Sequence, residues 1–224
     1  SPLDGVRPTL DPADEPERLS IQLYHRVVSP IPLERADVLE VSCGRGGGAD
    51  FTVRYLHPRR YVALDRTESA VAACRRRFTH PALAFTCGDA MSLPYQDAAF
   101  DAVINVEASH CYPGVPTFFA EVFRVLKPGG HFLYADFRRQ KALPQWRSQI
   151  AASALTLVDE EDMTPGVVAA LSTSHAVKSS LIQQVAPRFL RSTFNQFAGT
   201  KGSVIFRAFE KGNARYLRFV LRKP

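Results

Sequence analysis

Short apolar runs alternate with amphipathic segments through residue 137 of the chain. The apolar runs are bounded by glycine, proline or charged residues, as buried strands usually are, and they cover residues 36–44, 61–65, 82–89, 100–108 and 131–137. The segments between them place apolar residues at helical spacing, over residues 47–57, 68–78 and 115–130. Strands that alternate with helices in this way predict an α/β fold with a parallel, doubly wound sheet.

The two ends of the chain have different patterns. A short amphipathic helix is expected over 20–28, before Pro30 and Pro32 interrupt it. After residue 142 the pattern becomes helical and irregular, with helices expected over 142–155 and 175–190. The last residues alternate apolar and polar positions over 201–210 and 215–223, around a Lys-Gly-Asn-Ala turn. This ending predicts an antiparallel hairpin.

Composition narrows the class of protein. With 224 residues, 46% hydrophobic and 22% charged, the chain is typical of one globular domain. No apolar run approaches the roughly 18 residues that cross a bilayer, and the polar start has no signal-peptide core, so we expect no membrane span. Four cysteines without a CxxC pair are expected to be small buried residues in a reducing, cytoplasmic setting; they are Cys43, Cys74, Cys87 and Cys111.

The segment EVSCGRGGG, residues 40–48, lies between the first expected strand and the following helix. Glycines there let the backbone turn sharply and approach a ligand closely. Asp65 ends the next strand, where a carboxylate can accept hydrogen bonds from both ribose hydroxyls of a nucleotide, and Asp89 follows the third strand, where it can meet an adenine amino group. A glycine-rich loop alone is shared by several nucleotide sites and does not identify the cofactor.

Five segments in order resemble the successive motifs of class I S-adenosylmethionine-dependent methyltransferases. They are Glu40-x-x-x-Gly44-x-Gly46-x-Gly48, Asp65, Gly88-Asp89-Ala90, Phe100-Asp101-Ala102-Val103 and Leu126-Lys127-Pro128-Gly129-Gly130. Ser42 departs from the family pattern, in which glycine is frequent at that position. The resemblance implies a Rossmann-like, mostly parallel, seven-stranded sheet of order 3-2-1-4-5-7-6, with a C-terminal antiparallel hairpin and a helical lid.

The same resemblance implies a single methyltransferase domain over 1–224. Its parts are a leader and lid helix (1–33), a cofactor-binding core (34–141), a helical substrate lid (142–198) and the terminal hairpin of the sheet (199–224). The implied cofactor is S-adenosyl-L-methionine, with S-adenosyl-L-homocysteine as product. The implied cofactor residues are Glu40, Ser42, Gly44, Gly46, Asp65, Arg66, Asp89, Ala90, Asn105 and Val106.

Three further segments resemble narrower groups of methyltransferases. LEVSCGRGGG, NVEASHCYP and YADFR resemble the phthiotriolone-type methyltransferases of polyketide lipid assembly and the O-methyltransferase domains of modular polyketide synthases. These likenesses imply O-methylation of a polyketide or related hydroxyl acceptor, free or tethered to an acyl carrier protein. The net charge of +6 suits an acidic carrier as partner. The polar leader and the absence of an initiator Met fit a domain excised from a longer synthase or a trimmed chain.

An alcohol is a poor nucleophile unless its proton leaves as the new bond forms, so hydroxyl methylation calls for a general base. Glu107 and His110 follow the fourth expected strand, at the end of the sheet where doubly wound folds bind substrate. If the chain turns helically there, the two side chains lie on one face. We therefore predict that His110 is the base and Glu107 its supporting carboxylate. The alternatives are a structural histidine, and cofactor contact or helix capping by Glu107.

Four further residues are candidates for substrate contact, namely Tyr24, His25, Asp136 and His175. The alternatives are core packing for Tyr24 and His25, turn capping for Asp136 and a solvated surface position for His175. No set of Asp, Asn and Glu residues resembles a magnesium site, so we expect metal independence.

Three other functions stay open at this stage. The acceptor could be a carbon, a nitrogen or a sugar hydroxyl; the chain could be an NAD(P)-dependent oxidoreductase; or a basic surface could make it a binding module for nucleic acid or an acidic carrier. The segment Gly88-Asp89-Ala90, the Lys-Pro-Gly-Gly turn and the final hairpin speak against the oxidoreductase. No nucleic-acid motif with interleaved aromatic residues is present, so nucleic acid is not an expected partner.

Overall fold

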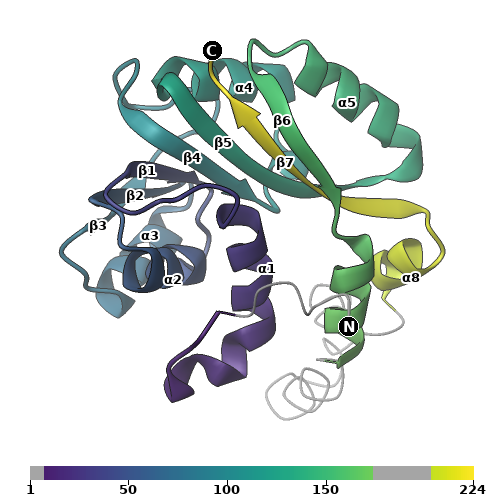
Figure 1. The fold of residues 1–224 in the computed structure, drawn as a ribbon, viewed down its shortest axis with the longest axis horizontal. Coiled ribbons are helices and arrows are strands. Elements are labelled where there is room, and N and C mark those ends of the chain that lie inside the picture. Colours follow the sequence, from purple (N-terminus) through teal and green to yellow (C-terminus); the bar gives the residue numbers. More distant parts are fainter. Residues whose placement is uncertain (1–7, 174–202) are drawn as a thin grey trace.

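The structure is a computed structural model that describes residues 8–173 and 203–224. Seven strands form one sheet of order β3-β2-β1-β4-β5-β7-β6 (Figure 1). The strands are β1 (Asp37–Val41), β2 (Arg60–Asp65), β3 (Leu83–Cys87), β4 (Phe100–Val106), β5 (Leu126–Arg139), β6 (Thr156–Asp162) and β7 (Ala214–Arg222). Pairing is parallel from β3 to β5, and β7 runs antiparallel to both β5 and β6. This confirms the predicted fold class and strand order.

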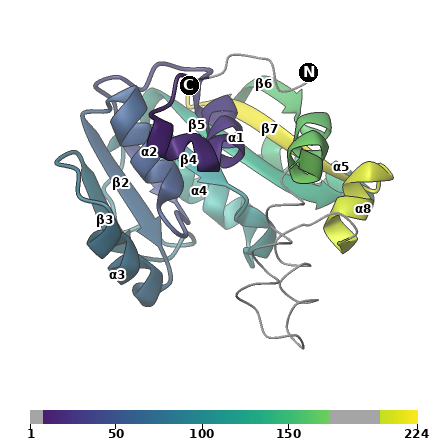
Figure 2. The same ribbon diagram turned by 90° about the horizontal axis from the view of Figure 1, so that it is seen from below.

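Helices cover both faces of the sheet (Figures 1 and 2). One face carries α1 (Arg18–Val28), α2 (Gly47–Leu56), α3 (Glu68–Arg77), α8 (Val204–Glu210) and a helical segment over 164–173. The other face carries α4 (Val115–Val125) and α5 (Leu143–Ala151). Short 3-10 turns are η1 (Pro12–Glu17), η2 (Ser109–Cys111) and η3 (Gln140–Ala142). Among these described residues, every helix is too short or too polar to cross a lipid bilayer.

The core has two layers, one on each side of the sheet. All five residues of β1 are buried, and alternate side chains of a strand point to opposite faces. Val38 accordingly packs in the layer under α1 and α2, while Leu39 packs in the layer under α4 and α5. The second layer is rich in aromatic rings, and Tyr134 at its centre stacks on Phe132 and meets Trp146 edge to face. Because β1 is covered on both faces, its carboxyl end is held firmly below the glycine loop.

The terminal hairpin differs from the prediction. The antiparallel partner of β7 at the sheet edge is β6, in a region expected to be helical, and residues 204–210 form α8 instead of a strand. Phe206 and Phe209 are both buried at helical spacing, and the Ser203 hydroxyl accepts a hydrogen bond from the Phe206 amide (3.2 Å), which caps the helix. Six of the seven β6 residues are exposed, so β6 lacks the apolar alternation that marks a strand in sequence.

The cysteines also divide differently from the prediction. Cys43 and Cys74 are buried, as expected. Cys87 and Cys111 are exposed, because they are the last residues of β3 and η2 and lie at the rim of the sheet where its core ends.

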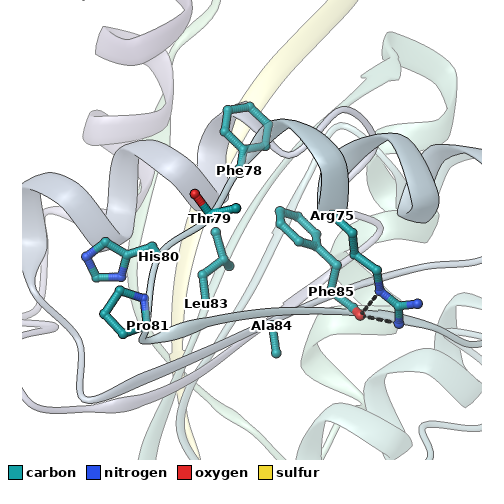
Figure 3. A pocket seen from close by; sticks show the side chains of 8 residues that line it. All are labelled: Arg75, Phe78, Thr79, His80, Pro81, Leu83, Ala84 and Phe85. Carbon is teal, nitrogen blue, oxygen red and sulfur yellow. Dashed lines mark hydrogen bonds between the residues drawn. The ribbon is translucent and has the colours of Figure 1, made fainter.

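The sheet ends on one side at β3, which packs against α3. The Ala82 carbonyl and the Gly88 amide form hydrogen bonds with β2. Backbone groups of successive residues in a strand point to opposite sides, so the carbonyl of Phe85, an odd number of residues from both, points away from β2 to the open side. The Arg75 guanidinium donates to this carbonyl through Nε (3.0 Å) and Nη2 (2.6 Å). Figure 3 shows this contact at the wall of a shallow hollow between the helix and the strand.

Candidate functional site

The loop between β1 and α2 turns through several left-handed residues. Ser42, Gly44 and Gly46 have φ angles of 63°, 54° and 75°. A Cβ on Gly46 would lie 3.0 Å from both the Phe85 ring and the Cys74 sulfur, so the underside of the loop is tightly packed. A Cβ on Gly44 would meet nothing within 4 Å, so the other side of the loop is open. The loop thus presents bare backbone at the carboxyl edge of the sheet.

The residues around this open backbone fit the adenosyl and amino-acid parts of S-adenosylmethionine. Asp65 ends β2 and accepts a hydrogen bond from the Gly44 amide (2.9 Å), so its carboxylate lies beside the loop. Asp89 is exposed beyond β3, where it can meet an adenine amino group. The buried Asn105 Oδ1 has no hydrogen-bond partner among the described residues. These groups are two carboxylates, open backbone and an unsatisfied acceptor. Together they are suited to ribose, adenine and ammonium groups.

Tyr112, which the sequence analysis did not single out, closes the back of this loop. The Ser42 hydroxyl lies 2.5 Å from the Tyr112 hydroxyl, and Asn105 Nδ2 donates to both that hydroxyl and the Val41 carbonyl (2.9 Å each). Burial raises the pKa of Tyr112 to about 12, so the hydroxyl keeps its proton. This network accounts for the departure from glycine at position 42, because the serine adopts the left-handed turn and gains a tie to Tyr112.

Glu40 is a buried carboxyl group directly beneath the loop. The Tyr24 hydroxyl donates to its Oε1 (2.5 Å) and the Tyr61 hydroxyl to its Oε2 (2.9 Å). Burial raises the pKa of Glu40 to about 7, although both tyrosine hydrogen bonds oppose the rise. Through these two contacts Glu40 links α1 and β2 to the end of β1.

Tyr24 lies on α1, and its ring packs on the start of α2. A Cβ on Gly48 would lie 2.2 Å from the Tyr24 ring, so the ring packs on bare helix backbone. The neighbouring His25 meets Phe51 edge to face, with ring centroids 6.1 Å apart, and burial lowers its pKa. Both residues were candidates for substrate contact, and the structure places them in the packing between α1 and α2.

The remaining cofactor candidates lie around the same edge of the sheet. Arg66 is exposed beyond β2, and its carbonyl accepts from the Cys87 thiol (3.4 Å). Ala90 is buried just after Asp89, and Val106 is the half-buried last residue of β4.

His110 sits in η2, immediately beyond the carboxyl end of β4. Its Nδ1 lies 2.8 Å from Oδ1 of Asp136, and its backbone amide donates to Oδ2 of the same carboxylate (2.8 Å). Asp136 is completely buried near the end of β5, whereas the His110 side chain is 28% exposed. A carboxylate at Nδ1 favours the tautomer that carries the proton there, which leaves Nε2 as the hydrogen-bond acceptor.

The carboxylate at His110 Nδ1 is therefore Asp136, whereas Glu107 was predicted for this supporting role. Glu107 has a left-handed backbone (φ 53°), and its amide donates to the Ala135 carbonyl (2.9 Å), so the chain leaves β4 in a sharp turn instead of a helix. The exposed Glu107 carboxylate interacts with the buried Tyr216 hydroxyl of β7. The pKa of Tyr216 is raised chiefly by burial and further by the negative charge of Glu107.

Asp136 remains an anion in spite of its burial. Burial opposes ionisation, but the hydrogen bond to His110 and the nearby Arg138 guanidinium hold the pKa of Asp136 below its ordinary value. Ser109 Oγ also donates to its Oδ2 (2.6 Å). A buried, ionised carboxylate behind a partly exposed imidazole is the arrangement of a general base with its orienting group.

Two other features lie apart from this edge. The hollow of ≈ 530 Å³ in Figure 3 is lined by eight residues between Arg75 and Phe85, where α3 ends and β3 begins. Within residues 8–173 and 203–224, no three His, Cys, Asp or Glu side chains gather as metal ligands would. His175 lies outside the described residues.

The sequence and fold match known proteins over nearly the whole chain. Residues 39–134 match the family described as "Methyltransferase domain". The phthiotriol/phenolphthiotriol dimycocerosates methyltransferase of Mycobacterium tuberculosis is 40% identical over 214 residues, which are 96% of this chain and 79% of that protein. A fatty-acid O-methyltransferase of Mycolicibacterium smegmatis is 36% identical over 96% of this chain and 78% of its own length.

A solved structure shares the fold at low sequence identity. Geranyl diphosphate methyltransferase in complex with S-adenosylmethionine superposes with a TM-score of 0.69 at 15% identity, over 96% of this chain and 93% of that one.

Proposed function

Because this chain belongs to the S-adenosylmethionine-dependent methyltransferases, we propose that it methylates a hydroxyl group of a polyketide-derived or related lipid acceptor, with His110 as general base. The contact between His110 Nδ1 and the buried Asp136 carboxylate is the observation that carries the proposal. His110 thus has the predicted role of general base, and Asp136 has the supporting role.

The chemistry divides between cofactor and protein. When bound, S-adenosylmethionine supplies an electrophilic methyl group on a sulfonium centre. The open side of the glycine loop, with Asp65 and Asp89 beside it, would hold the cofactor at the carboxyl edge of the sheet. His110 Nε2 would accept the hydroxyl proton as the oxygen attacks, and Asp136 would stabilise the imidazolium that forms. Alignment of the acceptor oxygen is the other main contribution of the protein.

The base supports a hydroxyl acceptor over a carboxylate. One relative is named for phthiotriol and phenolphthiotriol dimycocerosates and another for a fatty acid. A fatty-acid carboxylate is already ionised near neutral pH and needs no proton removed, whereas an alcohol does. A histidine oriented by a buried carboxylate would serve only the alcohol, so we propose an alcohol or phenol as the acceptor class.

Replacement of His110 by Gln tests the proposal. We expect kcat on a hydroxyl acceptor to fall about 100- to 10,000-fold, because glutamine cannot accept the proton. S-adenosylhomocysteine affinity, measured by titration calorimetry, should stay within a few fold of the unmodified protein. Turnover is measured as methylated product by mass spectrometry.

His80→Gln is the matched control, because His80 lies by the hollow of Figure 3 and away from the glycine loop. It should leave turnover unchanged. If His110→Gln methylated hydroxyl acceptors as fast as this control, the proposed role of His110 would be wrong. Faster turnover of a long-chain fatty acid than of every alcohol would instead remove the proposed acceptor class.

We propose further that the acceptor can be presented by an acidic acyl carrier protein. The narrower likeness to synthase O-methyltransferase domains and the net charge of +6 support this partner.

A further inference from the structure

The Arg138 guanidinium, which helps to keep Asp136 ionised, lies next to the proposed base. Its Nη1 is 3.0 Å from Asp136 Oδ2, and its Nη2 donates to Ser109 Oγ (2.8 Å). Nη1 also donates to the Phe137 carbonyl (2.8 Å), and only 13% of the side chain is exposed. The guanidinium is therefore a nearly buried cation on the far side of the carboxylate that holds His110.

The surroundings leave this cation little freedom to move. The Arg138 Cζ lies 4.5 Å from the centroid of the Trp146 ring of α5, a distance typical of a cation–π contact. Trp146 Nε1 in turn donates to the Tyr134 hydroxyl (2.9 Å), which contacts Ser109 Oγ. A planar guanidinium suits such a site, because it can stack on an aromatic ring while it donates along its edges.

The two oxygens of Asp136 have different partners. Oδ1 accepts from the Phe137 amide and faces His110 Nδ1, both at 2.8 Å. Oδ2 accepts from Ser109 Oγ and from the His110 amide, and it faces Arg138. The arginine thus engages the oxygen that does not contact the imidazole, and it fixes the plane of the carboxylate.

We propose that Arg138 is a positioning residue for the His110 base, because it fixes the Asp136 carboxylate that holds the imidazole. Loss of the Arg138 charge would leave the Asp136 carboxylate to attract a proton on His110 more strongly, and a protonated histidine cannot accept the hydroxyl proton. The positive charge of Arg138 offsets part of this attraction. This role rests on the proposed function of His110.

Other titratable groups face the same turn and leave the assignment intact. They are Tyr134 on β5, Tyr216 on β7, Tyr112 after η2 and the exposed Glu107. Burial raises the pKa of each of these three tyrosines above its ordinary value, so they are neutral where the enzyme works. The interaction of Glu107 that the structure shows is with Tyr216.

The test compares Arg138→Met, Arg138→Gln and Arg138→Lys in the intact chain, with Arg139→Met as the control. Arg139 is the next residue on β5 and is exposed, so its loss removes one charge away from Asp136. The pH at which His110 titrates is followed by NMR on protein with isotope-labelled histidine, with His110→Gln used to assign the signal. The kcat–pH profile is recorded for the same proteins.

We expect loss of the charge in the Met and Gln variants to raise the pH of His110 titration by about one unit. The acidic limb of the kcat profile should move in the same direction. Arg138→Lys, which keeps the charge, should stay within a few tenths of a unit, and the control should not move. Because glutamine keeps a donor toward Ser109, Arg138→Gln serves if the Met variant fails to fold.

An unchanged His110 titration in folded Arg138→Gln would overturn the proposal, and so would an equal shift in Arg138→Lys. The NMR readout does not depend on turnover. If His110→Gln were fully active, the proposed function would fail while the titrations still measured whether Arg138 controls the proton on His110.

Discussion

At the scale of single residues, Glu40 is a buried carboxyl group that links two elements of the fold. It receives one hydroxyl from α1, through Tyr24, and one from β2, through Tyr61. Since burial raises its pKa to about 7, the folded protein favours its protonated form relative to the unfolded chain, where a glutamic acid titrates near 4.5. Its ionisation must therefore weaken the fold.

Stability should accordingly depend on pH through Glu40. A raised carboxyl pKa gives stability that is fully present below pH 4.5 and is lost as the pH rises to about 7. The loss attributable to this group is on the order of 3 kcal/mol. Urea unfolding between pH 4.5 and 8 should show that the unfolding free energy of the unmodified protein falls relative to that of Glu40→Gln as the pH rises, because glutamine does not ionise. Parallel curves would refute the assignment; Glu34→Gln, on the surface, is the control.

The sequence predicted the site residues better than their partners. His110 and Asp136 were both candidates, yet they were assigned to different tasks, because local spacing favours Glu107 three positions away. Asp136 reaches His110 only because β4 and β5 are adjacent and in register, with Asn105 beside Tyr134. The left-handed turn at Glu107 carries no sequence signal, since glutamate rarely adopts it. Tyr112 was likewise missed, because its contact with Ser42 spans 70 positions.

At the scale of elements, α1 is attached to the cofactor loop through bare backbone. The Tyr24 ring occupies the space where any side chain at position 48 would begin. The preceding Gly47 has open space around its Cα, so the two glycines offer a matched pair in the same helical turn.

Gly48→Ala should therefore destabilise the protein, and Gly47→Ala should not. The methyl group at position 48 must displace Tyr24, at a cost of about 1–3 kcal/mol. At position 47 alanine should be neutral or stabilising by up to about 1 kcal/mol, because it restricts the unfolded chain without a clash. Urea unfolding measures both effects, and calorimetry should show weaker S-adenosylhomocysteine binding for Gly48→Ala alone. Equal stability of the two variants would contradict the packing.

Element prediction succeeded where burial imposes a pattern and failed where it does not. The apolar strands β1, β2 and β4 and the helices between them lie where the sequence placed them. The exposed β6, however, has no apolar face that would mark it as a strand, and α8 contains β-branched and aromatic residues, which are frequent in strands. Which of the two pairs with β7 is decided by tertiary packing, which overrides local preference.

At the scale of the whole molecule, the excess of basic residues matters for partners more than for the fold. A net charge of +6 produces a field that attracts an acidic macromolecule and has little effect on a neutral small one. Salt weakens such attraction, because the screening length falls from about 10 Å at 0.1 M to about 3 Å at 1 M.

If an acidic carrier presents the acceptor, its turnover should be sensitive to salt. We expect kcat/KM for the carrier-bound acceptor to fall about tenfold between 0.05 M and 0.5 M sodium chloride. The same acceptor as a free alcohol should change less than twofold. An identical salt response of the free and carrier-bound acceptors would argue against electrostatic docking.

The Arg75 contact at the end of the sheet has a consequence for behaviour at high concentration. An open strand edge offers a row of amides and carbonyls to which another extended chain can add, and growth of this kind begins aggregates. At β3 the guanidinium of Arg75 already occupies the outward carbonyl of Phe85 and sets a positive charge in the path of an incoming strand. The contact thus protects the molecule against self-association through β3, independently of its catalytic edge.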